Sequence, residues 1–588
     1  MGNIKKGFNF KLFSRLFIYI KSYQWIFYFL VFLVIAIAIC NAITPYLTKY
    51  AIDIILSTKD SKDFLFLITI MLTILILQTL CQHFFMYYAT WLGQSLVKDI
   101  RVSLFNHLLH FKKQYYDNSS VGVLMTRSVT DMERIADIFG QGLFMIIKDV
   151  LTMCVVLCVM FYINLRLSTI VFIMLPMLFY ATRLFHRYMK RAFEMVRTEV
   201  SNLNAFVQER LMGMKILQLF GRESIELQNF KHINDRHKKG WLKTVWYNSI
   251  FFPIADLSSS ITIGLLVWYG GAKAILDPYM ISQGDLVAFI MFTPMLFRPL
   301  RQIADKFNTV QMGMVAATRV FNVMDIDSKI DDSGTLEKEF QGDIKFKNVN
   351  FSYKQGEQIL KQVSFNAHKG GTTAIVGASG AGKSTIINLL NRFYDIDDGV
   401  ISIDDVNIKD ITLKSLRTQI AVVLQDVFLF SDTIFNNITL YNSEITESDV
   451  IEASKAIGIH DFIMTLPGGY QYNVKERGAT LSSGQRQLIS FLRAYVTKPH
   501  ILILDEATSS IDTHLELLIQ KAIQKITAGR TSIIIAHRLA TIREADKIIV
   551  MNQGEIIEEG THKILLNKEG YYKKLYDTQL LNELNLQQ

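Results

Sequence analysis

Long apolar runs alternate with polar, basic connectors over the first half of the chain. Each run is long enough to cross about 30 Å of hydrocarbon as a helix, at about 1.5 Å per residue. The pattern predicts an all-α transmembrane domain of about six helices over residues 24–317. The runs lie at 24–47, 64–90, 141–162, 167–186, 245–271 and 284–310.

The connectors between the runs set the expected topology. Residues 163–166 form a very short gap, whereas 91–140 and 187–244 are about fifty residues each, rich in Lys and Arg and helical in pattern. Segment 1–23 is basic and is expected to stay in the cytosol. Both long connectors then fall on the cytoplasmic side, in agreement with their positive charge.

The two long connectors predict helices that project from the membrane. A single helix from Phe64 to Phe111 would measure about 70 Å, well beyond the thickness of a bilayer. We expect the projecting helices to turn near Gln114–Ser120 and near Arg210–Lys215. Such projections would reach a cytosolic domain.

The pattern changes after the last apolar run. Residues 318–340 are mostly polar and predict a linker. From 341 to 588, short β-rich runs separate helical stretches, which predicts an α/β domain with a parallel core. The expected strands are Ile344–Phe351, Thr372–Val376, Ile401–Ile403, Ile501–Leu504, Ser532–Ile535 and Lys547–Met551.

Composition agrees with a membrane protein of at least two domains. The chain has 588 residues, 50% of them hydrophobic and only 20% charged, with a mean hydropathy of +0.24. The net charge of +9 could suggest nucleic acid, but no clustered basic stripe or binding module is present, so no nucleic-acid partner is expected. The four cysteines lie in apolar runs and predict no disulfide framework.

A phosphate-binding loop follows the strand expected at Thr372–Val376 and precedes a helical stretch. Its glycines let backbone N–H groups surround phosphate oxygens, Lys383 brings a positive charge to the outer phosphates, and Ser384 offers a hydroxyl to Mg²⁺. The loop residues, all expected to bind ATP, are Gly377, Ala378, Ser379, Gly380, Ala381, Gly382, Lys383, Ser384 and Thr385.

A second motif is the apolar strand expected at 501–504, which ends in two carboxylates, Asp505 and Glu506. At the end of a buried parallel strand, Asp505 is expected to hold Mg²⁺ through water. Glu506 is expected to polarise the attacking water as the catalytic base. Together with the phosphate loop, the pair predicts a P-loop NTPase.

Further segments point to one kind of P-loop NTPase. With their order and spacing, the chain resembles ATP-binding-cassette (ABC) transporters of the exporter branch, such as bacterial lipid flippases and multidrug half-transporters. The cytosolic segments that match are the signature Leu481–Gln485, Gln425 of the Gln loop, His537 of the switch, the D-loop Ser509–Asp512, Tyr353, and Glu476–Gly478. In the membrane half, residues 114–122 and 209–215 resemble the two coupling segments.

The resemblance implies roles that spacing alone does not give. Tyr353 would stack on adenine, Gln425 would touch Mg²⁺, and His537 would contact the γ-phosphate as a catalytic residue. Two chains would pair, so that the signature of one chain completes the ATP site of the other. The signature residues expected at the partner's ATP are Ser482, Ser483, Gly484 and Gln485.

Ser483 departs from the family, which most often has Gly at this position. In one explanation Ser is simply tolerated, because a Gly with negative φ can be replaced. In the other, the chain belongs to a heterodimer in which one of the two ATP sites is weak. Since Glu506 and His537 are present, the chain carries at least one competent site either way.

The resulting hypothesis is a half-transporter, homodimeric or heterodimeric, that exports or flips an amphiphilic substrate (lipid, drug or hydrophobic peptide) with ATP and Mg²⁺. Its expected place is the bacterial cytoplasmic (inner) membrane, in contact with lipid, with the ATPase domain in the cytosol. The rivals are an ATP-gated channel or regulator on the same scaffold, a soluble cassette ATPase, and an importer. The apolar runs disfavour the soluble form, and fusion of both domains disfavours the importer.

Several ionisable residues lie in or near the apolar runs, where a charge is costly and suggests a function. They are His83, Lys148, Asp149, Asp256 and Arg298. They are expected to be interface anchors or internal pairs, or, for Asp256 and Arg298, to line a substrate cavity.

Overall fold

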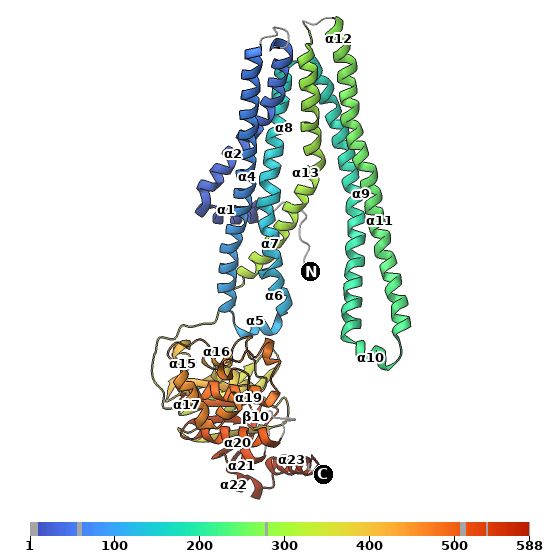
Figure 1. The fold of residues 1–588 in the computed structure, drawn as a ribbon. Helices are drawn as coiled ribbons and strands as arrows, with labels where there is room; N and C mark the ends of the chain where they lie inside the picture. The colour runs from blue at the N-terminus through green and yellow to red at the C-terminus, as the bar shows by residue number, and fades with distance from the viewer. Residues whose placement is uncertain are drawn as a thin grey trace. The chain divides into compact units, whose positions relative to one another are not determined.

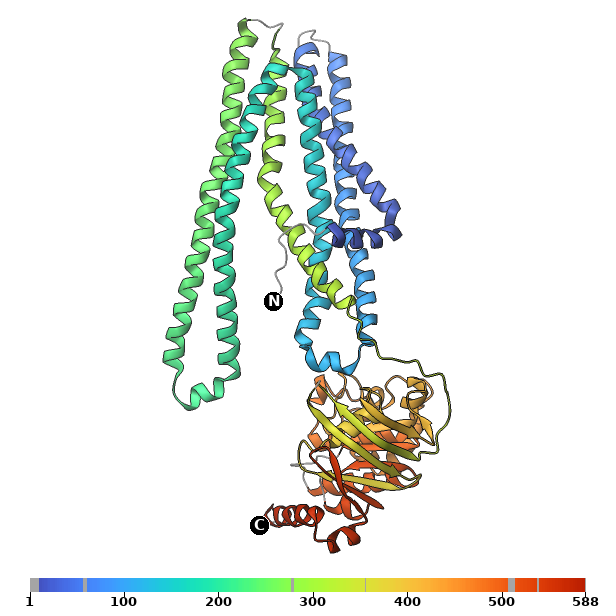
Figure 2. The ribbon, with the colours of Figure 1, turned by 180° about the vertical axis from the view of Figure 1, so that it is seen from behind.

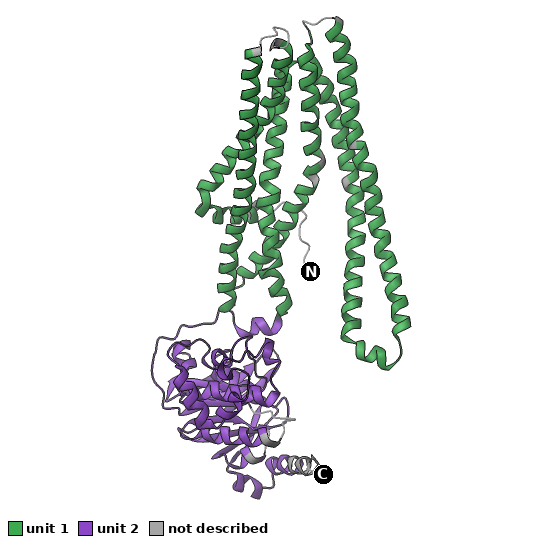
Figure 3. Cartoon of the chain, in the orientation of Figure 1, with its two compact units in different colours: residues 1–109, 119–327 green, residues 110–118, 328–588 purple. Residues whose placement is uncertain are grey.

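The structure is a computed structural model that describes residues 10–55, 61–276, 280–354, 356–505, 513–536 and 539–586. The chain forms two compact units (Figure 3), described separately below. Unit 1 comprises Met1–Leu109 and Ser119–Asp327, and unit 2 comprises His110–Asn118 and Ser328–Gln588.

Unit 1 is helical. Its elements are α1 (Phe10–Ile20), η1 (Lys21–Tyr23), α2 (Gln24–Tyr50), η2 (Ala51–Ile55), α4 (Ser61–Leu109), α6 (Val121–Ser128), α7 (Thr130–Asp137), η3 (Ile138–Leu143), α8 (Phe144–Ile163), α9 (Leu165–Met212), α10 (Met214–Leu219), α11 (Glu223–Leu265), η4 (Leu266–Gly270), α12 (Gly271–Leu276) and α13 (Gln283–Met324). η1 is a 3₁₀ turn, and η2, η3 and η4 are π-helical turns.

Among the described residues, six helical segments are long and apolar enough to span a membrane, which confirms the expected all-α transmembrane architecture. The short gap between the third and fourth spans is a turn at Asn164, whose side chain accepts from the backbone N–H groups of Arg166 and Leu167 and caps α9. The six segments are Leu12–Asp53, Lys62–Leu109, Val121–Ile163, Leu165–Met212, Glu223–Ile275 and Gln283–Met324.

The long helices and their turns lie where the sequence predicts them. α4 runs for 49 residues, and its chain then turns through the short helix α5 (Lys113–Asn118). α9 and α11 lie side by side (Figures 1 and 2), and α10 joins their ends. At Gly240 of α11 the two backbones come close, because an added Cβ would lie 3.1 Å from Cγ2 of Val196.

α13 continues to Met324, into the segment that the sequence marks as linker. The reason is an apolar stripe that goes on past residue 317: Val320, Phe321 and Val323 are all buried. Earlier in the same helix, Gly313 lets α13 pack closely against α7, because a Cβ at this position would lie 2.5 Å from the carbonyl oxygen of Arg134.

Unit 2 contains a four-stranded antiparallel sheet in the order β2-β1-β4-β5 and a six-stranded sheet in the order β10-β9-β3-β8-β7-β6. In the larger sheet only the β10–β9 pair is antiparallel. The strands are β1 (Ile344–Ser352), β2 (Gln358–Ala367), β3 (Thr372–Gly377), β4 (Asp398–Ile403), β5 (Val406–Asn407), β6 (Ile420–Val423), β7 (Ile501–Asp505), β8 (Thr531–Ile535), β9 (Lys547–Asn552) and β10 (Glu555–Gly560).

Helices cover this sheet on both faces, which confirms the expected α/β domain with a parallel core. β7 shows why its sequence is continuously apolar: Leu502 and Leu504 pack into one hydrophobic cluster, Ile501 and Ile503 into another. Besides α5, the helices of unit 2 are α14 (Lys383–Leu390), α15 (Leu413–Gln419), α16 (Ile434–Thr439), α17 (Glu447–Ile457), α18 (His460–Met464), α19 (Ser483–Val496), α20 (Thr513–Thr527), α21 (Leu539–Arg543), α22 (His562–Asn567) and α23 (Tyr571–Leu586), with 3₁₀ turns η5 (Gly469–Gln471) and η6 (Glu476–Gly478).

Candidate nucleotide site

The parallel strands of the six-stranded sheet end in register at one edge. Ile535 of β8 pairs with Ile375 of β3 on one side and with Asp505 of β7 on the other. Val423 of β6 pairs with Leu504 of β7. The loops that follow β3, β6 and β7 therefore begin at the same edge, which is where α/β proteins bind their ligands.

The loop after β3 has the backbone geometry of a phosphate cradle. Gly377 has no room for a side chain, because a Cβ would lie 2.3 Å from the carbonyl oxygen of Met551. Gly380 and Gly382 have φ values of +82° and +100°, which favour glycine. α14 then starts at Lys383, so the loop opens onto a helix N-terminus with free backbone donors.

Lys383 is held inside the loop. Its Nζ donates to the carbonyl oxygens of Gly377 at 2.8 Å and Ala378 at 2.9 Å, and only 7% of the residue is exposed. Burial lowers the pKa of Lys383, while the nearby Asp505 carboxylate acts in the opposite direction. A phosphate that enters the loop would supply the negative charge that the buried ammonium lacks.

Two oxygen donors lie together at the strand edge. Oγ of Ser384 donates to Oδ2 of Asp505 at 3.4 Å, and Asp505 is buried at the end of β7. A hydroxyl and a carboxylate suit Mg²⁺, which takes its remaining ligands from phosphate and water. The described residues hold no cluster of three or more His, Cys, Asp or Glu side chains for a metal. Gln425 is exposed two residues after β6.

Tyr353, expected at the adenine, is anchored to α14. Its hydroxyl donates to Oγ1 of Thr385 at 3.2 Å and accepts from Nδ2 of Asn388 at 3.2 Å. Its ring meets that of Tyr394 edge-on at a centroid distance of 5.0 Å. The ring is therefore fixed beside the phosphate loop, with part of its surface exposed.

Tyr394 is a residue that sequence reasoning missed. It connects the neighbourhood of the loop to α5, because its hydroxyl donates to the carboxylate of Asp117 and Nζ of Lys113 lies 5.9 Å from its ring centroid. Beside it, Lys112 pairs with Asp395 at 3.1 Å. The sequence offered only a weak signal for this contact. Tyr394 and Asp395 follow the helix of the phosphate loop, and the acidic Asp395 is complementary in charge to the lysines at the start of α5.

The signature segment forms the N-terminus of α19. Oγ of Ser482 accepts from the backbone N–H of Gln485 at 3.2 Å, and the Gln485 side chain accepts from the N–H of Ser482 at 2.9 Å. Ser482 and Ser483 are exposed, while Gly484 is buried. In the described part of the chain, neither the Ser482 nor the Gln485 side chain bonds to the phosphate loop of the same chain.

The two residues expected to be catalytic, Glu506 and His537, lie outside the described residues, as does the D-loop 506–512. The structure does describe the ends of their strands. β7 ends at Asp505, directly before Glu506, and β8 ends at Ile535, two residues before His537.

Charges in unit 1 form a separate group. The Asp149 carboxylate is buried, accepts from the ammonium of Lys306, and lies 3.9 Å from that of Lys148. Asp149 and Lys148 thus belong to an internal ion-pair group. Asp256 and Arg298 are exposed, and their role at a substrate cavity stays a prediction.

Comparison with known proteins gives matches over both units. The family described as ABC transporter transmembrane region matches residues 26–300, and the family described as ABC transporter matches 360–509. The chain is 35% identical to the ABC transporter ATP-binding protein YknV of Bacillus subtilis (strain 168) over 580 residues, 98% of this chain and 96% of that protein.

A second relative and a solved structure agree. An ATP-dependent lipid A-core flippase of Syntrophus aciditrophicus (strain SB) is 34% identical over 551 residues, 93% of this chain and 91% of that protein. The structure of a bacterial Atm1-family ABC exporter with ATP bound covers 95% of this chain and 98% of its own, with a TM-score of 0.76 and 28% identity. The chain therefore belongs to the ABC transporter family, as an exporter-type half-transporter whose ATPase domain is coupled to transmembrane transport.

Proposed function

We propose that the chain is one half of a dimer that exports or flips an amphiphilic lipid, drug or hydrophobic peptide by alternating access. One observation carries the proposal. A phosphate cradle with a buried Lys383 and the Ser384–Asp505 oxygen pair lies on the same chain as the six candidate spans. Export and lipid flipping in the names of related proteins support this over an ATP-gated channel.

The proposed nucleotide chemistry combines the residues at the strand edge with the roles that the family resemblance implies. The backbone N–H groups of 378–383 and the Lys383 ammonium hold the β- and γ-phosphates. Ser384, Asp505 and Gln425 would hold Mg²⁺, which would neutralise developing charge on the phosphates. Glu506 takes a proton from the attacking water. By its resemblance to the switch histidine, His537 would contact the γ-phosphate and orient that water.

Dimerisation completes the site. The exposed Ser482 and Ser483 lie at the N-terminus of α19, a helix of 14 residues, where free backbone N–H donors favour an anion. We assign these two residues, with Gly484 and Gln485, to the ATP bound by the partner chain. The α10 turn also exposes apolar side chains that a second chain would cover. They are Leu211, Met212, Ile216, Leu219 and Phe220.

The remaining assignments rest on family and composition. We propose residues 24–317 as the membrane domain, 318–340 as a linker whose first part continues α13, and 341–588 as the nucleotide-binding domain with its tail, after the cytosolic segment 1–23. We place the protein in the bacterial cytoplasmic membrane, which suits the basic cytosolic connectors.

The test uses the full chain in proteoliposomes with a fluorescent phospholipid and a hydrophobic dye as cargo. ATP should drive movement of at least one of them. Lys383→Ala and Glu506→Gln should each lower ATP hydrolysis by about 100-fold or more and stop movement. An exposed-lysine variant, Lys369→Ala, is the control. ATP hydrolysis by Glu506→Gln at the parent rate would refute the assignment of Glu506 as the catalytic base. ATP hydrolysis by the parent without movement of either cargo would refute transport of the phospholipid and the dye.

A further inference from the structure

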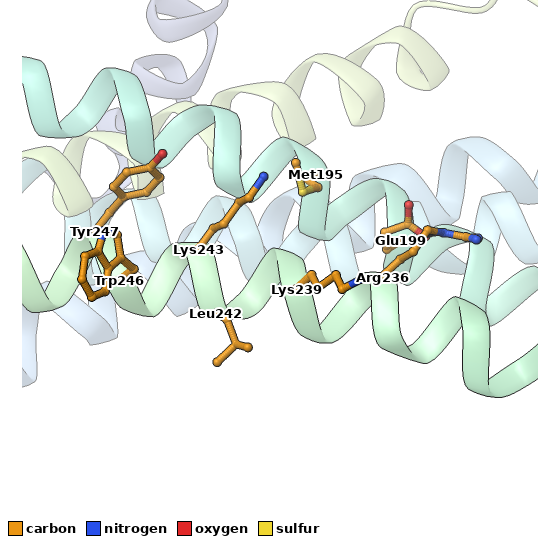
Figure 4. Close-up of a pocket in the computed structure, with 8 residues that line it drawn as sticks. All are labelled: Met195, Glu199, Arg236, Lys239, Leu242, Lys243, Trp246 and Tyr247. Carbon is orange, nitrogen blue, oxygen red and sulfur yellow. Dashed lines mark hydrogen bonds and ion pairs between the residues drawn. The ribbon is translucent and has the colours of Figure 1, made fainter.

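A groove of about 570 Å³ runs along the paired helices α9 and α11, far from the nucleotide site in the sequence. Figure 4 shows Trp246 and Tyr247 at one end, Arg236 and Glu199 at the other, and Lys239 and Lys243 between them. Its lining residues are Met195, Glu199, Arg236, Lys239, Leu242, Lys243, Trp246 and Tyr247.

The groove carries two positive charges that the rest of the described chain leaves uncompensated. Its one carboxylate, Glu199, is already engaged, because it accepts from Nε of Arg236 at 3.1 Å and from Asn202 at 3.3 Å. Lys239 and Lys243 are exposed and form no ion pair among the described residues. A ligand with negative charge therefore fits between the two ammonium groups.

The position of the groove along α11 matches a membrane interface. The apolar run of this helix begins at residue 245, at its cytoplasmic end by the topology above. Trp246 and Tyr247 are the aromatic types that gather at headgroup level. Lys243 and Lys239 lie about 5 and 10 Å further toward the cytosol along the helix, within reach of a lipid headgroup.

The aromatic end of the groove is held in place by packing and adds an apolar surface to the charged part. The rings of Tyr247 and Tyr188 of α9 stack at a centroid distance of 5.7 Å, which fixes Tyr247 against the neighbouring helix. Trp246 and Leu242 are 66% and 55% exposed. They offer an apolar surface next to the lysines, so the ligand should combine an anion with an apolar body.

We propose that this groove binds the phosphate headgroup of an anionic lipid of the cytoplasmic leaflet. Lys239 and Lys243 bind the phosphate, while Leu242 and Trp246 contact the glycerol and upper acyl carbons. The site lies on the surface of one helix pair and uses none of the nucleotide-binding residues. Free phosphate lacks the apolar body, and a second chain is the competing occupant that the experiment must separate.

The experiment is lipid titration of the purified full-length protein by native mass measurement, with dioleoyl phosphatidylglycerol against dioleoyl phosphatidylcholine. The parent should prefer phosphatidylglycerol. The double variant Lys239→Gln/Lys243→Gln should bind it about tenfold more weakly, with phosphatidylcholine unchanged. The matched control Lys231→Gln/Lys238→Gln removes the same charge from the same helix outside the groove and should keep the preference. ATP hydrolysis by both variants shows that they are folded.

Three results would overturn the proposal. One is equal loss of phosphatidylglycerol in both double variants, because binding would then reflect general surface charge. A second is displacement of the bound lipid by millimolar inorganic phosphate, which would mark a plain anion site. The third is a change in oligomeric state confined to Lys239→Gln/Lys243→Gln, since the groove would then lie between two chains. Trp246→Leu should weaken the binding of phosphatidylglycerol and leave the effect of inorganic phosphate on that binding unchanged.

Discussion

The nucleotide site of unit 2 and the charged groups of unit 1 are built by different means. In unit 2 the backbone makes the site: Gly377 and Gly382 shape the loop, and Lys383 and Ser384 follow at once in the sequence. In unit 1 the charged groups are made by side chains from distant helices, as with Asp149 and Lys306, which are 157 residues apart. A local motif can specify the first kind of site, whereas only the folded bundle specifies the second.

The largest effect expected from this comparison is in unit 1. Lys306→Met leaves the buried Asp149 with only Lys148, 3.9 Å away, so an ionised carboxylate loses its main partner. We expect a cost of about 2–3 kcal/mol and a fall of about 5 °C in the melting temperature in detergent. Circular dichroism or dye-based melting would measure it.

Two variants sharpen that result. Lys215→Met removes an exposed lysine from α10 and should leave the melting temperature within about 1 °C. Lys306→Met/Asp149→Leu removes both partners and should recover part of the loss. Equal melting of Lys306→Met and the parent would show that the pair does not stabilise the bundle.

In unit 2 the matching change is in the backbone. Gly377→Ala places a Cβ 2.3 Å from the carbonyl oxygen of Met551, and the loop has to move. We expect ATP affinity to fall about tenfold, measured with a fluorescent ATP analogue.

Gly370→Ala is the control for this change. Gly370 also has a positive φ, +72°, but nothing lies within 4 Å of an added Cβ, and it precedes β3 at the opposite end of the strand from the phosphate loop. Its cost should appear in stability, with ATP affinity within about twofold of the parent. A similar loss of affinity in both glycine variants would mean that general instability, not the loop, is measured.

These contrasts explain what the sequence could predict. The spans were predicted because an apolar run of about twenty residues or more is a strong signal for a membrane helix, and β7 because Ile501–Leu504 is apolar without interruption. β6 was missed because it directly follows α15, so its short apolar run could not be told from the end of a helix. β2 was missed because its alternation is broken at Lys361–Gln362, where Gln362 has a φ of +48°.

For the candidate site, the motif residues could be named from the sequence but their mutual contacts could not. The contact between Tyr394 and Asp117 joins residues 277 apart, and no local pattern links them. The same holds for the groove on α9 and α11, where Glu199 and Arg236 are 37 residues apart. From the sequence, the lysines of α11 could be recognised only as part of a basic connector, and the ones without an ion-pair partner among the described residues could not be identified.

Tyr394→Phe probes a long-range contact inside unit 2. It removes the hydroxyl that donates to Asp117 of α5 and keeps the ring that packs against Tyr353. We expect a loss of about 1 kcal/mol in stability. Cargo moved per ATP should fall about twofold, with ATP affinity unchanged, because α5 is held less firmly beside the loop.

The control for this change is Tyr441→Phe. It removes another hydroxyl that donates to a carboxylate, that of Asp432, nine residues away, and it should leave cargo per ATP unaltered. If Tyr394→Phe weakened ATP binding as strongly as Gly377→Ala, the hydroxyl would serve the nucleotide pocket and not α5.

The smallest effect is expected at Ser483. The structure places it as the first residue of α19, directly after the capping Ser482, so its backbone is helical and needs no positive φ. Ser483→Gly should therefore change stability by no more than about 0.5 kcal/mol and ATP hydrolysis by less than about twofold. Hydrolysis by the reconstituted parent and variant, side by side, measures this. A tenfold or greater rise in the variant would instead mean that Ser483 weakens the ATP site it completes, and would favour an asymmetric pair of chains over two equal ones.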